Sequence, residues 1–210
     1  RMYDTVLVLA PHTDDGEIGC GGTIARFIEE GKTVHYVAFS TARTSVRPEF
    51  PENILEIEVK KSTAILGVKP ENLHVLDFPV RHFPEHRQDI LQALVDLRKA
   101  HTPDLILLPS PTDVHQDHQV IANEGLRAFN SHTVLGYEEH ANNIEFATRC
   151  FIPLDERHVQ KKIDALNAYE SQKHRSYLDN NFVWSMARMR GTQFEGQYAE
   201  AFEVLRWIYQ

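Results

Sequence analysis

Two short segments of the chain concentrate side chains of the kinds that bind metal ions. The first holds His12, Asp14 and Asp15, and the second holds His115 and His118. Imidazole nitrogen and carboxylate oxygen are the ligands of catalytic Zn²⁺ sites, in which two histidines and one carboxylate leave a position open for water or substrate. The sequence therefore predicts one divalent-metal centre built from both segments, with carboxylates to spare.

Neighbouring residues within each segment are expected to have different tasks. Successive side chains in a tight turn diverge, so Asp14 and Asp15 are not expected to bind one ion together. One would bind the metal, and the other would remain free as a base. His115 and His118 are three residues apart and share a face in a first helical turn. One could bind metal while the other meets the oxygen of a polarised carbonyl.

Each segment follows a short apolar run that is typical of a buried strand. The first run ends at Pro11 and the second at Pro109. Strand and helix patterns alternate through the first part of the chain, which predicts an α/β fold with a mostly parallel sheet and helices on both faces. Ligands of such sheets collect outside the carboxyl ends of the strands, near the point where strand order reverses. Both segments should therefore face one crevice.

The expected helices and strands are predicted from the spacing of apolar residues and from the glycines and prolines that end them.

The glycine-rich turn at 19–22 resembles a dinucleotide-binding motif, but Ile24 stands where the Gly-x-Gly-x-x-Gly fingerprint needs its third glycine. Close backbone packing explains this turn better. The segment 41–51 is expected to be a mobile loop. Strands are expected at 5–10, 33–39, 73–76, 104–108, 133–137, 144–150 and 201–205, and helices at 23–30, 53–66, 88–100 and 156–172.

Length and composition favour one soluble domain over residues 1–210. The formal charge of −8 and the lack of a Lys/Arg block argue against a nucleic-acid partner. Two cysteines, Cys20 and Cys150, form no metal-binding pair, which suits a reducing compartment. No apolar run approaches the roughly 18 residues of a membrane span, and no signal-peptide pattern begins the chain. These features predict a cytoplasmic protein.

Two motifs carry a resemblance to a known family. They are Pro11-His12-x-Asp14-Asp15-x-Glu17-x-Gly19-Cys20-Gly21-Gly22-Thr23 and Thr112-Asp113-x-His115-x-Asp117-His118. With them the chain resembles the LmbE-like or PIG-L family of zinc-dependent N-deacetylases, which act on N-acetylglucosamine-containing compounds. The resemblance implies a Rossmann-like three-layer fold, a Zn²⁺ cofactor, and an amino-sugar substrate. Fe²⁺ or another divalent metal fits the same ligands. Homo-oligomers occur among such proteins, although no segment here identifies an interface.

The resemblance also assigns a role to each matching residue. His12, Asp15 and His118 would be the zinc ligands. Asp14 would be the general base that activates water and then the acid that protonates the leaving amine. His115, protonated, would stabilise the oxyanion, and Asp117 would be its orienting partner.

Substrate recognition is where the chain departs from the family pattern. Many members carry an arginine three residues before the glutamate that Glu58 matches, and this chain has Leu55 there. Two alternatives to deacetylation stay open: a metal-dependent hydratase or lyase acting on a carboxylated substrate, and a non-catalytic, metal-stabilised binding module. The expected substrate-binding residues are Arg43, Arg47, Arg190, Tyr198 and Glu200.

Overall fold

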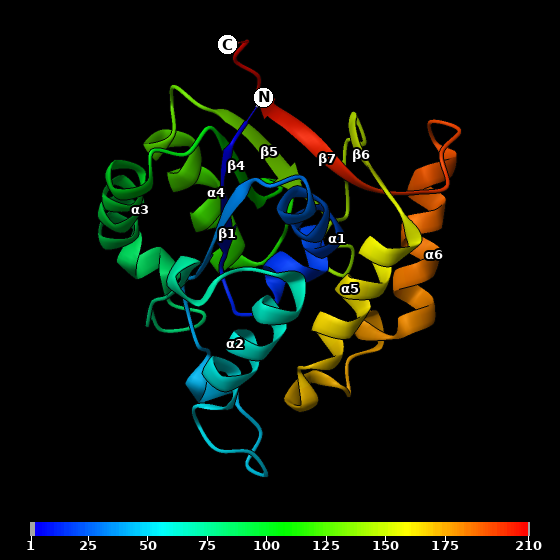
Figure 1. Cartoon of the computed structure of the whole chain (residues 1–210). Coiled ribbons are helices and arrows are strands. Elements are labelled where there is room, and N and C mark those ends of the chain that lie inside the picture. The colour runs from blue at the N-terminus through cyan, green and yellow to red at the C-terminus, as the bar shows by residue number, and fades with distance from the viewer. Residues whose placement is uncertain (1–2, 210) are drawn as a thin grey trace.

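The computed structural model of the protein describes residues 3–209 and is built on one seven-stranded sheet (Figure 1). The strand order is β3-β2-β1-β4-β5-β7-β6. The first five strands in this order are parallel, whereas β7 runs antiparallel to both β5 and β6. The predicted mostly parallel α/β fold is therefore confirmed. The strands are β1 (Thr5–Ala10), β2 (Thr33–Ala38), β3 (Leu73–Val75), β4 (Leu105–Pro109), β5 (Thr133–Tyr137), β6 (Cys150–Leu154) and β7 (Tyr198–Arg206).

Helices cover both faces of the sheet and make a three-layer arrangement (Figure 1). Alternate residues of β1 point to opposite layers: Val6 and Val8 pack under α1, α2 and α5, whereas Leu7 and Leu9 pack under α3 and α4. A third cluster joins α6 to α5 and β6. The helices are α1 (Asp15–Glu29), α2 (Ile54–Leu66), α3 (Arg87–His101), α4 (Gln116–Ala128), α5 (Glu156–Asn167) and α6 (Asn180–Thr192).

The strand order reverses between β1 and β4, which lie side by side and parallel. The chain moves outward from β1 through β2 to β3, and then crosses back by way of α3 to β4 on the other side of β1. The loops that follow β1 and β4 consequently diverge to opposite faces and leave a crevice between them. These are the two loops that carry the predicted metal ligands.

The start of α1 differs from its predicted form. The helix begins at Asp15 rather than at Thr23, and the glycine-rich segment is its first half, with a non-helical residue at Cys20. Packing explains the glycines. A Cβ atom on Gly19 would lie 2.2 Å from the Tyr137 ring, whose hydroxyl donates a hydrogen bond to the Leu9 carbonyl. The prediction of close backbone packing is correct, but the prediction of a turn there is wrong.

The last third of the chain departs most from the sequence prediction. The strand expected at 144–150 is wrong, because the strand is β6 at Cys150–Leu154. The sequence prediction missed this strand because it contains Pro153. Proline, which has no N–H to donate, is tolerated there because β6 is an edge strand of the sheet. The helix expected at 156–172 ends at Asn167, β7 is longer than its expected 201–205, and α6 was not predicted.

A buried carboxyl group supports the turn after β1. Glu17 accepts a hydrogen bond from Ser62 Oγ at 2.5 Å and lies against the hydroxyls of Tyr36 and Tyr169. Both tyrosine hydroxyls are also within hydrogen-bond distance of the Thr13 carbonyl, at 2.6 and 2.9 Å. Burial raises the pKa of Glu17 to about 7, against the opposing effect of these hydrogen bonds. The network thus ties α1, α2, β2 and the segment after α5 to the backbone between His12 and Asp14.

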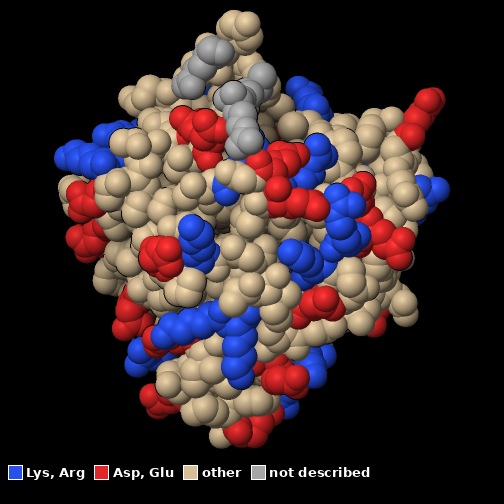
Figure 2. All heavy atoms as spheres, in the orientation of Figure 1, with Lys and Arg blue, Asp and Glu red and all other residues tan. Residues whose placement is uncertain are grey.

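The surface agrees with the charge pattern of the sequence. Acidic and basic side chains are interspersed over the face shown in Figure 2. In residues 3–209, no helix has the length and apolar character needed to cross a membrane.

Substitution of Gly19 tests the packing of α1. Gly19→Ala should lower the free energy of unfolding by about 1–3 kcal/mol, because the Tyr137 ring and the helix must separate. Gly21→Ala is the matched control, since its Cβ atom would meet only the flexible stem of Lys162, at 3.0 Å; it should change stability by less than about 1 kcal/mol. Urea unfolding measures both. Equal effects of the two substitutions would contradict this account.

Glu17 should make stability depend on pH. An acid whose pKa rises from 4.5 to about 7 on folding stabilises the folded state fully below pH 4.5, and this stabilisation is lost as the pH rises through 7. At about 1.4 kcal/mol per pKa unit, the loss is about 3 kcal/mol. Glu17→Gln should remove it, so the variant should gain stability relative to the wild type as pH rises. Urea unfolding across this range tests the prediction, with exposed Glu52→Gln as the control. A difference between Glu17→Gln and wild type that does not vary with pH would refute it.

Candidate active site

The two predicted segments meet in one cavity at the carboxyl ends of β1 and β4. The cavity has a volume of about 360 Å³ and is open to solvent. His12 lies in the turn after β1, and Asp15 begins α1. His115 is the N-cap residue of α4, and His118 lies in the first turn of that helix. All four side chains line the cavity, as does Asp14.

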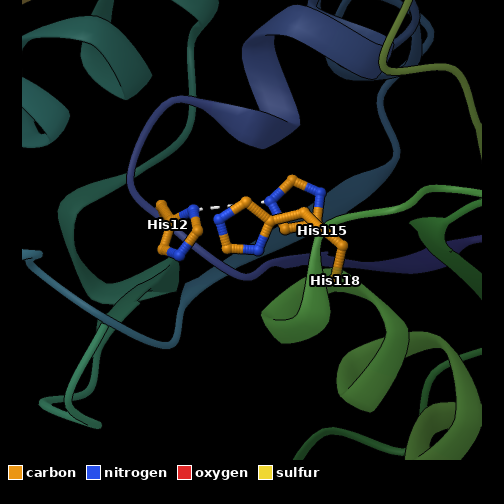
Figure 3. A group of neighbouring side chains, drawn as sticks. All are labelled: His12, His115 and His118. Carbon is orange, nitrogen blue, oxygen red and sulfur yellow. Dashed lines mark hydrogen bonds between the residues drawn. The ribbon is translucent and has the colours of Figure 1, made fainter. Parts of the chain in front are cut away.

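Three ligand-type atoms form a nearly equilateral triangle. His12 Nδ1 lies 3.3 Å from Asp15 Oδ2 and 3.4 Å from His118 Nε2, and the latter two atoms are 3.2 Å apart. Tetrahedral Zn²⁺ with bonds of about 2.0–2.1 Å needs ligand atoms about 3.3 Å apart. These three atoms therefore fit a divalent metal without rearrangement. In Figure 3 a dashed line joins the facing nitrogens of His12 and His118, and the ring of His115 lies between the two rings in this view.

Carboxylates fix the outward-facing nitrogens of both histidines. His12 Nε2 lies 2.8 Å from Asp117 Oδ2, and His118 Nδ1 lies 2.6 Å from Asp113 Oδ2. If each outward nitrogen donates its proton to its carboxylate, the inward nitrogen can act as a metal ligand once the ring is neutral. The expected pairing of the Asp117 carboxylate with His115 is not present, because this carboxylate accepts hydrogen bonds from His12 and from the backbone N–H groups of Arg81 and Phe83.

The three triangle residues are coupled electrostatically. Burial would lower the pKa values of His12 and His118, but the charge of Asp15 outweighs it, with help from the outer carboxylates, and raises both. Burial would conversely raise the pKa of Asp15, and the two histidines hold it well below its usual range. The metal-free site therefore carries protons that a metal ion must displace.

Asp14 stays outside this triangle although it is adjacent to Asp15. Burial raises its pKa to about 6, the negative charge of Asp15 adds to the shift, and Arg175 opposes it. The side chain makes no capping hydrogen bond to α1. A carboxylate that titrates near neutrality and faces the same cavity has the properties of a general base.

His115 differs from the protonated form that the resemblance implies. Burial, together with the charges of His118 and His12, lowers its pKa to about 4. Its Nδ1 accepts a hydrogen bond from the backbone N–H of Asp117 at 3.1 Å. The proton of the neutral ring consequently sits on Nε2, so His115 can donate a hydrogen bond without being charged.

Glu139 is a site residue that the sequence analysis missed. It is 4% exposed, lines the cavity, and has a carboxyl oxygen within 4.8 Å of ligand atoms of Asp15 and His118. Burial and the charge of Asp15 raise its pKa well above the usual value, and its Oε1 has no hydrogen-bond partner among residues 3–209. Glu139 lies two residues after the end of β5, so the rule that ligands gather at carboxyl ends of parallel strands could have found it.

The arginines expected to bind substrate do not line the cavity. Arg43 is half-exposed and lies 3.8 Å from both Glu56 and Asp77, and Arg47 pairs with Glu49 at 2.8 Å. Both belong to the segment after β2, where their side chains turn toward neighbouring acids. Arg81 and Arg175 line the cavity instead.

The three remaining substrate candidates have contacts elsewhere. Arg190 forms an ion pair with Glu138, and Tyr198 packs against Trp184. Glu200 accepts hydrogen bonds from the backbone N–H groups of Gly22 and Thr23 and from Lys162. These contacts anchor α1 and α6 to β7, and none of the three residues lines the cavity. Leu55, by contrast, does line it.

Comparisons with known proteins identify the family of the chain. The model of the PIG-L family, described as GlcNAc-PI de-N-acetylase, matches residues 7–129, more than half of the chain. A diacetylchitobiose deacetylase of Thermococcus kodakarensis is 30% identical over 154 residues, which is 65% of this chain. The alignment spans 56% of that relative, so the chain covers little more than half of its length.

Solved structures share the fold. An N,N'-diacetylchitobiose deacetylase from Pyrococcus horikoshii has a TM-score of 0.78 at 22% identity, covering 97% of this chain and 84% of the other. GalB, the 4-carboxy-2-hydroxymuconate hydratase of Pseudomonas putida KT2440, has a TM-score of 0.80 at 21% identity, covering 99% of this chain and 98% of the other. At these identities the likeness concerns the fold alone. Together with the family match over both motif-bearing loops, it shows that the chain belongs to the PIG-L, or LmbE-like, family.

Proposed function

We propose that the protein is a metal-dependent deacetylase that hydrolyses the acetamide of an N-acetylglucosamine-type amino sugar. The observation that carries this proposal is the separation of two adjacent carboxylates. Asp15 belongs to the triangle of ligand atoms, whereas Asp14 faces the same cavity with a pKa of about 6. A non-catalytic binding module in which the metal only stabilised the fold would not need the uncoordinated carboxylate of Asp14.

His12, Asp15 and His118 would hold the metal, with zinc as the first choice and Fe²⁺ compatible with the same atoms. A bound divalent ion supplies Lewis acidity, which can lower the pKa of water to about 7 and polarise a carbonyl group. The carboxylates of Asp117 and Asp113 would keep the two rings in the required tautomers and orientations.

Asp14 would move the proton during hydrolysis. With a pKa of about 6 it is mostly ionised at neutral pH, so it can accept a proton from the attacking water. The protonated carboxyl group is then an acid of suitable strength to protonate the departing amine, because an amide nitrogen cannot leave as an anion. The products would be acetate and a free amino sugar.

His115 would stabilise the charge that develops on the carbonyl oxygen. Its Nδ1 is occupied by the Asp117 N–H, so Nε2–H remains free to donate. A preorganised donor of this kind typically contributes about 2.7–4 kcal/mol to transition-state stabilisation. This neutral form replaces the imidazolium that the family resemblance suggests.

Arg175 and Arg81 are the cationic groups we assign to substrate binding. Both line the cavity, and Leu55, which replaces the usual family arginine, lines it too. Arg175 donates a hydrogen bond to the Tyr177 hydroxyl, so its guanidinium is held in place beside Asp14. Arg175, from the segment before α6, would thus supply the positive charge that the family arginine supplies from the position of Leu55 in α2.

The first test is incubation of metal-analysed protein with N,N'-diacetylchitobiose and related N-acetylglucosaminides, with measurement of acetate and free amine. The wild type should release both in equal amounts. Asp14→Asn should reduce kcat about 10²–10⁴-fold with metal content unchanged, and His118→Ala should lose the metal. Asp77→Asn, an exposed control, should behave as wild type.

Two outcomes would overturn parts of this assignment. Loss of metal in Asp14→Asn would mean that the base and the ligand are exchanged. Absence of acetate, with addition of water to an unsaturated carboxylate, would favour the hydratase alternative, which the fold of GalB also accommodates.

The role of Asp117 gives a second test. If it orients His12, Asp117→Asn should weaken metal affinity by about 10–100-fold, and Asp113→Asn should have a similar effect through His118. Metal titration with a chelator as competitor measures the affinity. If Asp117 instead served His115, the substitution would lower kcat and leave the affinity for metal unchanged.

A further inference from the structure

A second cluster of histidines lies away from the catalytic cavity. His35 is in the middle of β2, His74 is the central residue of β3, and His101 is the last residue of α3. Neighbours of His35 and His74 in their strands pack under α1 and α2, so these two side chains point to the opposite face, toward α3. None of the three lines the catalytic cavity.

The three rings are close enough to share one ion. His35 Nδ1 and His74 Nε2 are 3.2 Å apart, close to the spacing of about 3.3 Å that tetrahedral Zn²⁺ requires. One nitrogen of each histidine, His101 included, lies within 4.8 Å of the others. The ring centroids of His35 and His101 are 4.1 Å apart, and those of His74 and His101 are 4.6 Å apart. His101 lies at a helix end and is partly exposed, so it is the ring with most freedom to adjust.

The chemistry of the cluster is that of an all-imidazole ligand set. Within residues 3–209, no carboxylate forms an ion pair with any of the three rings. Burial and the neighbouring histidines lower the pKa of His35 to about 4 and also lower that of His74. These two rings are therefore neutral at pH 7, which is the form that binds metals.

We propose that His35, His74 and His101 form a second binding site for a divalent transition-metal ion, with Zn²⁺ as the expected occupant. Neutral imidazole favours Zn²⁺, Ni²⁺ and Cu²⁺ over Mg²⁺ and Ca²⁺, which prefer oxygen ligands. The ion would join β3, a three-residue strand at the edge of the sheet, to β2 and to the end of α3. Its effect would be on the stability of this edge, separate from catalysis.

The test is the number of Zn²⁺ ions bound by untagged protein, measured by calorimetric titration and by metal analysis after gel filtration. The wild type should bind two equivalents. His74→Gln and His101→Gln should each bind one and keep the wild-type rate of substrate turnover. His118→Ala should also bind one, at the second site. His132→Gln, which changes a histidine outside both clusters, should still bind two.

Thermal unfolding provides an independent measurement. Zn²⁺ added to His118→Ala should raise Tm, because an ion that binds only the folded state stabilises it. Zn²⁺ added to the double variant that carries both His118→Ala and His74→Gln should leave Tm unchanged. The proposal would be overturned if the wild type bound one equivalent and His118→Ala bound none, or if His74→Gln and His101→Gln both bound as many equivalents as the wild type. Circular dichroism of each metal-free variant shows whether the loss of one bound Zn²⁺ ion is caused by unfolding. If His74→Gln does not fold, His101→Gln decides the question.

Discussion

The adjacency of β1 and β4 is the constraint on which the rest of the site depends. His12 and His118 are separated by 106 positions in the chain, yet their facing nitrogens are 3.4 Å apart. This approach is possible because the two parallel strands end side by side at the reversal of strand order, and their loops open toward each other. Any change that slides β4 along β1 would separate the ligand atoms before it exposed the core. The hydrogen bonds that the Asp117 carboxylate accepts from the backbone N–H groups of Arg81 and Phe83 tie a third segment to the same point.

The environment, rather than the residue type, gives each carboxyl group of the site its task. The positive charges of His12 and His118 hold Asp15 ionised, whereas Asp14, one residue earlier, has a pKa of about 6. Glu17 lies below the same turn with a pKa of about 7 and supports the backbone. Burial keeps Glu139 protonated well above the usual range. Groups whose surroundings drive their pKa values apart can act as ligand, base and scaffold within a few ångströms.

The sequence predicts the elements that local patterns specify. Buried parallel strands appear as apolar runs, and Gly67 ends α2 in the left-handed conformation, at φ 96°. The convergence of the two motifs could be predicted because it depends on strand direction alone. The helical start of α1 could not be predicted, because its glycines respond to the Tyr137 ring, which comes from a strand far along the chain. The contact of Asp117 also depends on a distant segment: the family resemblance implied His115 as its partner, but the turn after β1 brings His12 to 2.8 Å from the carboxylate.

The residues that we propose for substrate binding are the hardest to predict because they come from segments that no periodic pattern specifies. Arg81 follows β3 in a loop, with a positive φ of 70°, and Arg175 lies between two short turns before α6. Neither is near a motif in sequence, and both reach the cavity only when the sheet and its covering helices are assembled. The groups proposed for the chemistry, by contrast, are fixed to two strand ends. The fold therefore places the groups proposed for the chemistry at two strand ends and the residues proposed for substrate binding on loops.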